Sequence, residues 1–289
     1  MTNNIDRIKS MKIRVIEANL KALNSTEYAR FQSLSDKDKE EYVHKNWVKF
    51  QVRPAKESLE RMNALLHPLL RVAVDKGLTD LIGNELVAGM GRKMMNILEF
   101  HEIMIRLAAA VPDRVPKETI QLHFPSYLML FEGAFTEEVN LVAYLLAVSG
   151  KEFYRRKRGS KVPVPISSYR QMQSMRMRDK FNYLAEGGFD FVIEAGDYDL
   201  RNSIAHCEYD LSTDGIFCYA RQGHGSVSLS LEEMDSKHET LLQHAACFQR
   251  SALQFYVDFV KSAFSIYPEP VRKELLNSLG FHFDELEKP

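Results

Sequence analysis

An arginine, an asparagine and a histidine lie close together in the segment RNSIAH, at Arg201, Asn202 and His206. A guanidinium stays charged at neutral pH and presents a planar fork that fits phosphate oxygens. An imidazole, with an ordinary pKa near ~6.5, gives or takes a proton at neutral pH. These residue types meet what attack of an RNA 2′-hydroxyl on the adjacent phosphate requires: His206 can move the proton, Arg201 can hold the phosphate, and Asn202 can orient the phosphate or the histidine ring. No metal is needed.

The spacing of the motif limits how the two charged groups can meet. Five positions along an ideal α-helix turn the chain by ~140° beyond one full turn. Arg201 and His206 therefore do not share one face of a straight helix. Either the helix starts or bends inside the motif, or the site is assembled from two copies of the chain.

The segment resembles the Arg-Asn-x-x-x-His signature of the HEPN superfamily, a group of small helical bundles that includes metal-independent ribonucleases of toxin–antitoxin and phage-defence systems. The setting is similar as well. Leu200 precedes the arginine, Ile204 and Ala205 precede the histidine, and an acidic and aromatic stretch leads to a hairpin and a long final helix. The resemblance covers roughly residues 117–264.

The resemblance implies an endoribonuclease that leaves a 2′,3′-cyclic phosphate and a 5′-hydroxyl. It also implies a homodimer in which two motifs meet across a shared cleft, and an antitoxin or other regulatory partner that restrains the activity. Non-catalytic members of the family exist. The alternative is therefore an HEPN-like module that binds RNA, a nucleotide or a protein without cutting. A third hypothesis is a helical interaction protein in which the motif only stabilises the fold.

A second arginine and histidine, Arg61 and His67, fit the looser spacing of the family. Met62 follows this arginine, and Pro68 follows the histidine inside an amphipathic helical pattern. We interpret this pair as structural.

Positive charge gathers in one stretch of the chain. Residues 151–180 hold ten Lys and Arg against two Asp and Glu, although the formal net charge of the chain is only −1. A local positive field suits a polyanion such as RNA, and Tyr154 and Tyr169 flank the most basic part, where they could stack on bases. The alternative is that the most basic part is only a solvated loop between two helices. The predicted RNA contacts are Arg155, Arg156, Lys157, Arg158, Arg176, Arg178 and Lys180.

Three carboxylates precede the basic stretch, on the helix that we expect to pack beside the motif. Glu132 is the candidate that orients Arg201 or His206, and Glu137 and Glu138 follow it closely. The alternative for all three is a salt bridge at the surface or at an interface.

The fold class that these patterns predict is mainly α: a helical bundle of HEPN type with a small β-hairpin insertion, preceded by a helical region over residues 1–113. Pro112 and Pro116 mark the boundary, and a second helical unit begins near Pro125 and stops around Gly150. Residues 151–168 form an exposed connector.

The second half of the chain continues with helical stretches. One runs from Tyr169 to Leu184, and a shorter one ends at Ala195. Asp197 or Asp199 caps a helix that carries the motif. A β-hairpin is expected at about 216–230. The last long helix starts at Leu231, after the Ser230 and Glu233 pattern of a capping box, and ends near Phe264, and residues 265–289 form a tail with a short helix.

The remaining composition points to a cytoplasmic protein without a cofactor. The three cysteines are too few for a disulfide framework, and no apolar run approaches the ~20 residues that span a bilayer. No glycine-rich phosphate loop is present. His206, Cys207, Cys218 and His224 lie close in sequence but lack the paired Cys-x-x-Cys spacing of a structural zinc site, so no metal is predicted.

Overall fold

The computed structural model describes residues 13, 25–39, 41–42, 55–110, 116–151, 153–156, 163–221, 225–263 and 265. These residues are mostly helical and include a three-stranded antiparallel sheet and a two-stranded ribbon, which agrees with the predicted fold class at the level of a mainly helical protein. The predicted terminal helix lies outside the described residues.

A long helical rod organises the molecule. It consists of α6 (Pro116–Leu130), the π-helical turn η2 (Phe131–Phe135) and α7 (Thr136–Val148). Proline is well suited to the first position of a helix, where its missing N–H has no intrahelical acceptor, and Pro116 occupies that position. Pro125 lies inside α6, so the prediction that this unit begins near Pro125 is wrong.

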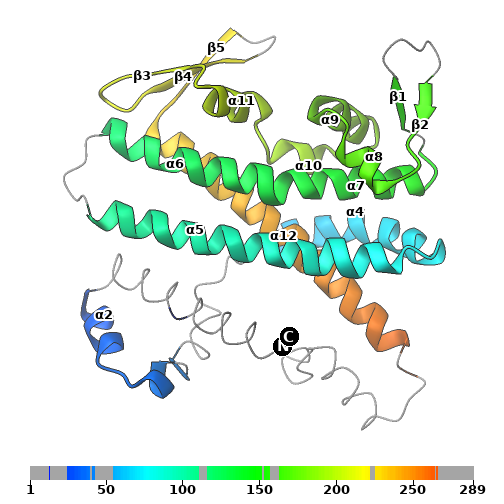
Figure 1. Cartoon of the computed structure of the whole chain (residues 1–289), viewed down its shortest axis with the longest axis horizontal. Helices are drawn as coiled ribbons and strands as arrows, with labels where there is room; N and C mark the ends of the chain where they lie inside the picture. The colour runs from blue at the N-terminus through cyan, green and yellow to red at the C-terminus, as the bar shows by residue number, and fades with distance from the viewer. Residues whose placement is uncertain are drawn as a thin grey trace.

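Three further helical segments pack against the rod. The N-terminal ones are α4 (Lys56–Asp75) and α5 (Met90–Ala110), which follows the π-helical η1 (Leu81–Gly89). In Figure 1, α5 runs alongside the rod and α12 (Leu231–Ala263) crosses both diagonally. Buried residues of all these helices belong to one hydrophobic core. The predicted boundary near Pro112 therefore does not separate two hydrophobic cores, because the helices before and after it share one core.

The short helix α2 (Ser25–Gln32) belongs to a second, smaller cluster. Its Phe31 is fully buried among partly buried residues that include Tyr28, Leu34 and Tyr42. The edge of Phe31 meets Tyr42, with ring centroids 5.3 Å apart.

Short elements cover the other side of the rod (Figure 1). The predicted helix over 169–184 is two helices, because Ser174 to Arg176 interrupt it. Gly187 and Gly188 end the second one, as predicted, and Gly188 has a φ of +83° that suits glycine. In chain order these elements are α8 (Tyr169–Gln173), α9 (Met177–Glu186), α10 (Asp190–Glu194) and α11 (Tyr198–His206).

The sheet next to α11 contains the predicted hairpin and one more strand. Strand β4 (Phe217–Arg221) lies between β3 (Tyr209–Leu211) and β5 (Gly225–Leu229), and both pairings are antiparallel. The inner side of β4 is aromatic: Phe217 and Tyr219 are buried, and Phe217 meets Phe124 of α6 edge-on at 5.2 Å. The sheet is thus fixed to the rod.

Part of the predicted connector forms two short strands. Strands β1 (Tyr154–Arg156) and β2 (Pro163–Pro165) pair antiparallel, so a small hairpin stands where a coil was expected. Lys157, Arg158 and Lys161 lie outside the described residues.

The predicted start of the last long helix is confirmed. The Ser230 backbone N–H donates to Glu233 Oε2 at 2.7 Å, and the Glu233 N–H donates to Ser230 Oγ at 3.2 Å. This reciprocal pair is a capping box. Among the described helices, none has both the length and the apolar character that crossing a membrane requires.

Candidate functional site

The motif lies on α11, which is a regular helix with a defined start and end. Asp197 is the N-cap, and its Oδ1 accepts the Leu200 N–H at 3.0 Å. Cys207 follows the last turn in the left-handed conformation, at φ 56°, and the Glu208 N–H donates back to the Ser203 carbonyl at 2.8 Å. The helix is continuous from Tyr198 to His206, so the alternative in which it starts or bends inside the motif is wrong.

Burial divides α11 into two faces. Leu200, Ser203 and Ile204 are buried against the core and define its inner face. At ~100° per residue, Asn202 lies opposite the inner face, and Arg201 and His206 lie near the two edges of the exposed side, ~140° apart. We call Tyr198, Asp199, Arg201, Asn202 and His206 the outer face. All three motif residues belong to it.

Arg201 has two partners among the described residues, of which Glu132 was predicted, either as an orienting carboxylate or as a salt bridge, and Asn202 was not. Its Nη1 donates to Asn202 Oδ1 at 2.6 Å, and its guanidinium forms an ion pair with Glu132 of η2. The side chains of Arg201 and Glu132 are 25% and 45% exposed, so solvent reaches the pair. A phosphate can therefore approach the guanidinium without the core opening.

His206 is exposed at the end of α11. No hydrogen bond or ion pair joins its imidazole to another of the described residues. Within one chain, the structure brings Arg201, Asn202 and Glu132 together and leaves His206 one turn further along.

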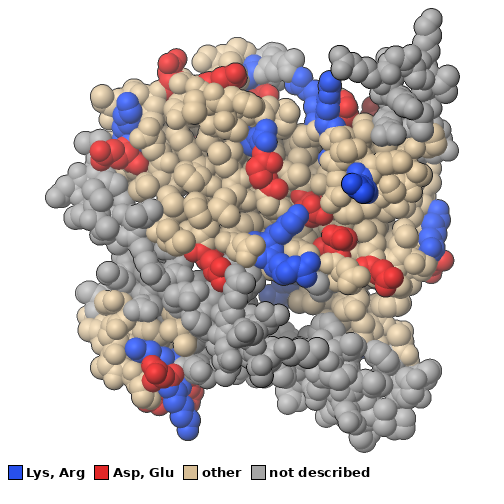
Figure 2. All heavy atoms as spheres, viewed as in Figure 1, with Lys and Arg blue, Asp and Glu red and all other residues tan. Residues whose placement is uncertain are grey.

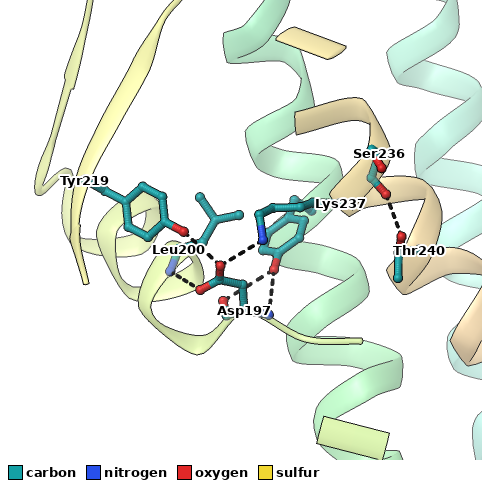
Figure 3. Close-up of polar contacts among 7 residues, drawn as sticks. Asp197, Leu200, Tyr219, Ser236, Lys237 and Thr240 are labelled. Atoms are coloured by element: carbon teal, nitrogen blue, oxygen red, sulfur yellow. Dashed lines mark hydrogen bonds and ion pairs between the residues drawn. The ribbon is translucent and has the colours of Figure 1, made fainter. Parts of the chain in front are cut away.

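Asp197 anchors the start of the motif helix (Figure 3). Its Oδ2 accepts the Tyr219 hydroxyl at 2.8 Å and the Lys237 ammonium at 3.0 Å, from β4 and α12. The Tyr127 hydroxyl of α6 bonds to the Asp197 backbone N–H and carbonyl at 3.2 and 3.3 Å. One residue therefore fixes α11 to three other elements. Sequence reasoning identified the cap but not these partners.

The charge of Asp197 is stabilised despite its burial. Burial alone raises the pKa of this carboxyl, but the Leu200 N–H, the Lys237 ammonium and the Tyr219 hydroxyl outweigh it and hold the pKa below its ordinary value. Asp197 is therefore a carboxylate at neutral pH. It positions the motif helix and is not available for proton transfer.

The loop before Asp197 passes very close to the rod. A methyl group on Gly196 would overlap the ring of Phe135 in η2. Only glycine allows this approach, which places the first turn of α11 against the π-helical turn that also carries Glu132.

The predicted RNA contacts fall into different environments. Arg176 and Arg178, at the start of α9, are exposed. Arg155 and Arg156 belong to β1, whose backbone alone is described.

Lys180 corrects one of these predictions. Its side chain is buried, and its ammonium donates to Asn140 Oδ1 at 2.5 Å and to the Gln173 carbonyl at 3.2 Å. Burial lowers the pKa of Lys180 to about 8, against the opposing field of Glu137. An ammonium with these partners does not contact an RNA backbone, so the RNA-contact prediction for Lys180 is wrong.

Tyr169, a candidate for stacking on bases, contacts two other residues of its own chain. Its hydroxyl donates to Glu137 and its ring meets Tyr144 edge-on at 5.7 Å.

Glu137 and Glu138 are buried and do not touch the motif. Glu137 pairs with Lys93 of α5 at 2.8 Å. Glu138 Oε1 lies 2.6 Å from His244 Nε2 of α12, with both side chains almost fully buried. Burial raises the pKa of Glu138, although His244 opposes the shift. The two carboxylates connect helices of the core.

The residues of the second arginine and histidine pair contact the interior, as the structural interpretation predicts. The guanidinium of Arg61 lies over the Phe191 ring at 4.4 Å. His67 Nε2 is 3.1 Å from the Ser251 carbonyl.

A pocket of about 240 Å³ opens beside the start of α11, and we call it the α9–α11 pocket. Arg178 is the only one of the predicted RNA contacts among its described lining residues. Arg221, at the end of β4, was not identified from the sequence, because its neighbours carry no motif. The described lining also includes Phe181, Glu194, Asp197, Tyr198 and Asp199.

No set of three or more His, Cys, Asp and Glu side chains is grouped to hold a metal ion within the described parts of the chain. On the face shown in Figure 2, the basic and acidic side chains of the described residues are interspersed, so no single-sign patch dominates it. No family model matches the chain, and neither curated proteins nor solved structures give a significant match.

Proposed function

We propose that this protein is a metal-independent endoribonuclease of HEPN type that acts as a homodimer. The observation that carries the proposal is the outer face of α11: Arg201, Asn202 and His206 all avoid the buried side of one continuous helix. Charged and polar side chains that stay clear of the core suit a polyanionic substrate.

The proposed reaction is attack of a 2′-hydroxyl oxygen on the neighbouring phosphorus. The His206 imidazole takes the proton of the hydroxyl, and the imidazolium that results gives a proton to the departing 5′-oxygen. The products are a 2′,3′-cyclic phosphate and a 5′-hydroxyl. Arg201 stabilises the extra negative charge on the phosphate, and Asn202 holds the guanidinium through the 2.6 Å hydrogen bond.

The geometry of the motif supports the homodimer. Arg201 and His206 stand ~140° apart on a helix without a bend, and the exposed imidazole has no partner among the described residues of its own chain. Two outer faces packed about a two-fold axis would bring an arginine of one copy near a histidine of the other.

The test is cleavage of labelled single-stranded RNA in the presence of EDTA. Arg201→Ala and His206→Ala should each lower the rate by about 10²–10⁴-fold, because each removes a group that acts on the reacting atoms. Both side chains lie at the surface, so the variants should fold, which circular dichroism would verify. Arg250→Ala, which removes an exposed arginine of α12, is the control. Unchanged cleavage in both motif variants would end the proposal.

The dimer has its own test. Mixing Arg201→Ala and His206→Ala chains forms heterodimers in which one site keeps both groups. The mixture should recover cleavage that neither variant shows alone. A mixture that stays inactive, or a wild-type protein that sediments as a monomer at assay concentration, would contradict the composite site.

One observation favours a second candidate, an HEPN-like module that binds RNA, a nucleotide or a protein and does not cut. The Glu132 carboxylate already neutralises much of the Arg201 charge, so a phosphate must compete for the guanidinium. Salt-dependent RNA binding without any cleavage would select this candidate.

A further inference from the structure

The α9–α11 pocket combines charges of both signs. Arg178 comes from α9 and Arg221 from the end of β4, and both are exposed. Neither forms an ion pair with another described residue. Two guanidiniums from separate elements thus turn toward one hollow without being neutralised by a close carboxylate.

The carboxylates of the pocket give it acceptors as well. Asp197 is held by Lys237 and Tyr219, whereas the exposed Glu194, which also lines the pocket, has no hydrogen bond or ion pair to another described residue. A simple phosphate site would exclude such carboxylates, because like charges repel. The lining therefore fits a neutral group with both donors and acceptors at its edge.

The pocket also has an aromatic wall. Phe181 and Tyr198 are half-buried and meet edge-on, with ring centroids 6.2 Å apart. Aromatic side chains beside polar ones are how proteins hold a base that has left its stack. At about 240 Å³ the pocket is smaller than the usual site of a drug-sized ligand, and its size suits a single base.

We propose that the α9–α11 pocket binds the guanine base of an unstacked RNA nucleotide next to the bond that is cut. This inference rests on the proposed ribonuclease function. Guanine offers two neighbouring donors, N1–H and N2–H₂, which the two oxygens of the Glu194 carboxylate accept. It offers acceptors at O6 and N7, to which Arg178 and Arg221 donate. Adenine and cytosine each present one amino group, and uracil presents none, so guanine matches this lining best.

The pocket and the motif share the outer face of α11. Tyr198 lines the pocket, and Asn202 lies four residues later, one turn along the same face. A base held against Tyr198 thus places its own strand across Arg201 and Asn202. The pocket selects which bond the motif reaches.

The experiment measures binding apart from cleavage. The His206→Ala chain is titrated with labelled oligouridine that carries one central guanosine, inosine or adenosine, and fluorescence anisotropy gives each Kd. Guanosine should bind about ten-fold more tightly than adenosine, and inosine, which lacks only the 2-amino group, should lose most of that gain. In the same chain, Glu194→Gln and Arg221→Ala should remove the preference, whereas Glu186→Gln and Arg250→Ala should keep it.

A free guanine nucleotide is the other source of the same base. Guanosine monophosphate should compete with the guanosine oligonucleotide and bind much more weakly. Tight binding of the mononucleotide without competition would overturn the RNA assignment, and equal Kd values for all three oligonucleotides would overturn the pocket itself.

Cleavage by the wild-type chain separates the two proposals. Cutting without base preference, together with equal Kd values, removes the guanine pocket and leaves the ribonuclease. Guanine-selective binding without any cutting removes the ribonuclease and leaves a guanine-specific RNA-binding pocket.

Discussion

Two groups of carboxylates, only a few residues apart in the chain, have different roles. Glu137 and Glu138 are buried between α5, α7 and α12, where they meet Lys93 and His244. Glu132 stands at the surface and meets Arg201 of the motif. The two groups differ in how deeply their carboxylates are buried. A buried ion pair holds helices together, whereas an exposed one contributes little to stability and leaves its arginine open to a ligand.

The largest expected effect on stability comes from breaking the buried contact between Glu138 and His244. Glu138→Ala leaves His244 without its partner inside the core and should lower the free energy of unfolding by about 3–5 kcal/mol, measured by urea denaturation. Glu138→Gln should lose less, because a neutral amide still accepts a hydrogen bond. Replacing Glu138 and His244 together by leucine should restore most of the stability. A wild-type urea midpoint for Glu138→Ala would show that the pair is not buried.

The next effect tests the contact between the core and the motif. Gly196→Ala inserts a methyl group against Phe135 and should cost about 1–3 kcal/mol. It should also reduce RNA cleavage, since the first turn of α11 must move. Gly91→Ala, where the methyl meets only Gln249 at 3.8 Å inside a helix, should be neutral or stabilising. Equal stabilities for the two variants would argue against the close approach.

A pH titration distinguishes Asp197 from Glu138. The pKa of Asp197 is lower in the folded state, so its contribution is present above its ordinary value of 3.8 and is lost as the pH falls below it. The pKa of Glu138 is raised, so its ionisation opposes folding as the pH rises above 4.5. Asp197→Asn should remove about 1–2 kcal/mol at pH 7 and flatten the acid limb of stability against pH. An unchanged acid limb would contradict this assignment.

The smallest effect on stability belongs to the exposed pair. Glu132→Gln should change the free energy of unfolding by less than about 1 kcal/mol. Its effect on cleavage should be larger: kcat should fall about ten-fold because Arg201 loses its orientation, while RNA binding at low salt should not weaken. A variant with wild-type kcat would show that Glu132 only shields the guanidinium.

Local signals in the sequence predicted the helix ends well. The capping box of Ser230 and Glu233 and the Asp197 cap are short-range patterns, and all three hydrogen bonds are present. Pro125 misled the prediction because the packing of α6 tolerates a proline inside the helix. Strand β3 was missed, since three residues are too few for an alternating pattern and pairing with β4 decides the outcome.

Burial of charge could not be predicted from the chain. Lys180 follows Arg176 and Arg178 and resembles them in type, yet only it turns inward to Asn140. Its partner lies 40 residues away, so the contact depends on how α9 packs on α7. Glu132 does contact Arg201, which fits both the orienting role and the alternative salt bridge, and the same reasoning gave no way to separate it from Glu137. The resemblance of RNSIAH to an HEPN motif remains a prediction.

The left-handed Cys207 has a practical consequence. The chain turns sharply at this residue, which leaves its thiol exposed directly after His206. Cys247 is buried, and burial raises the pKa of its thiol to about 12, which makes it a poor competitor for alkylating reagents. In a Cys218→Ser chain, which removes the half-buried third thiol, a fluorophore attached at Cys207 would therefore sit at the corner where substrate and a second copy are proposed to arrive, and its brightness would follow both.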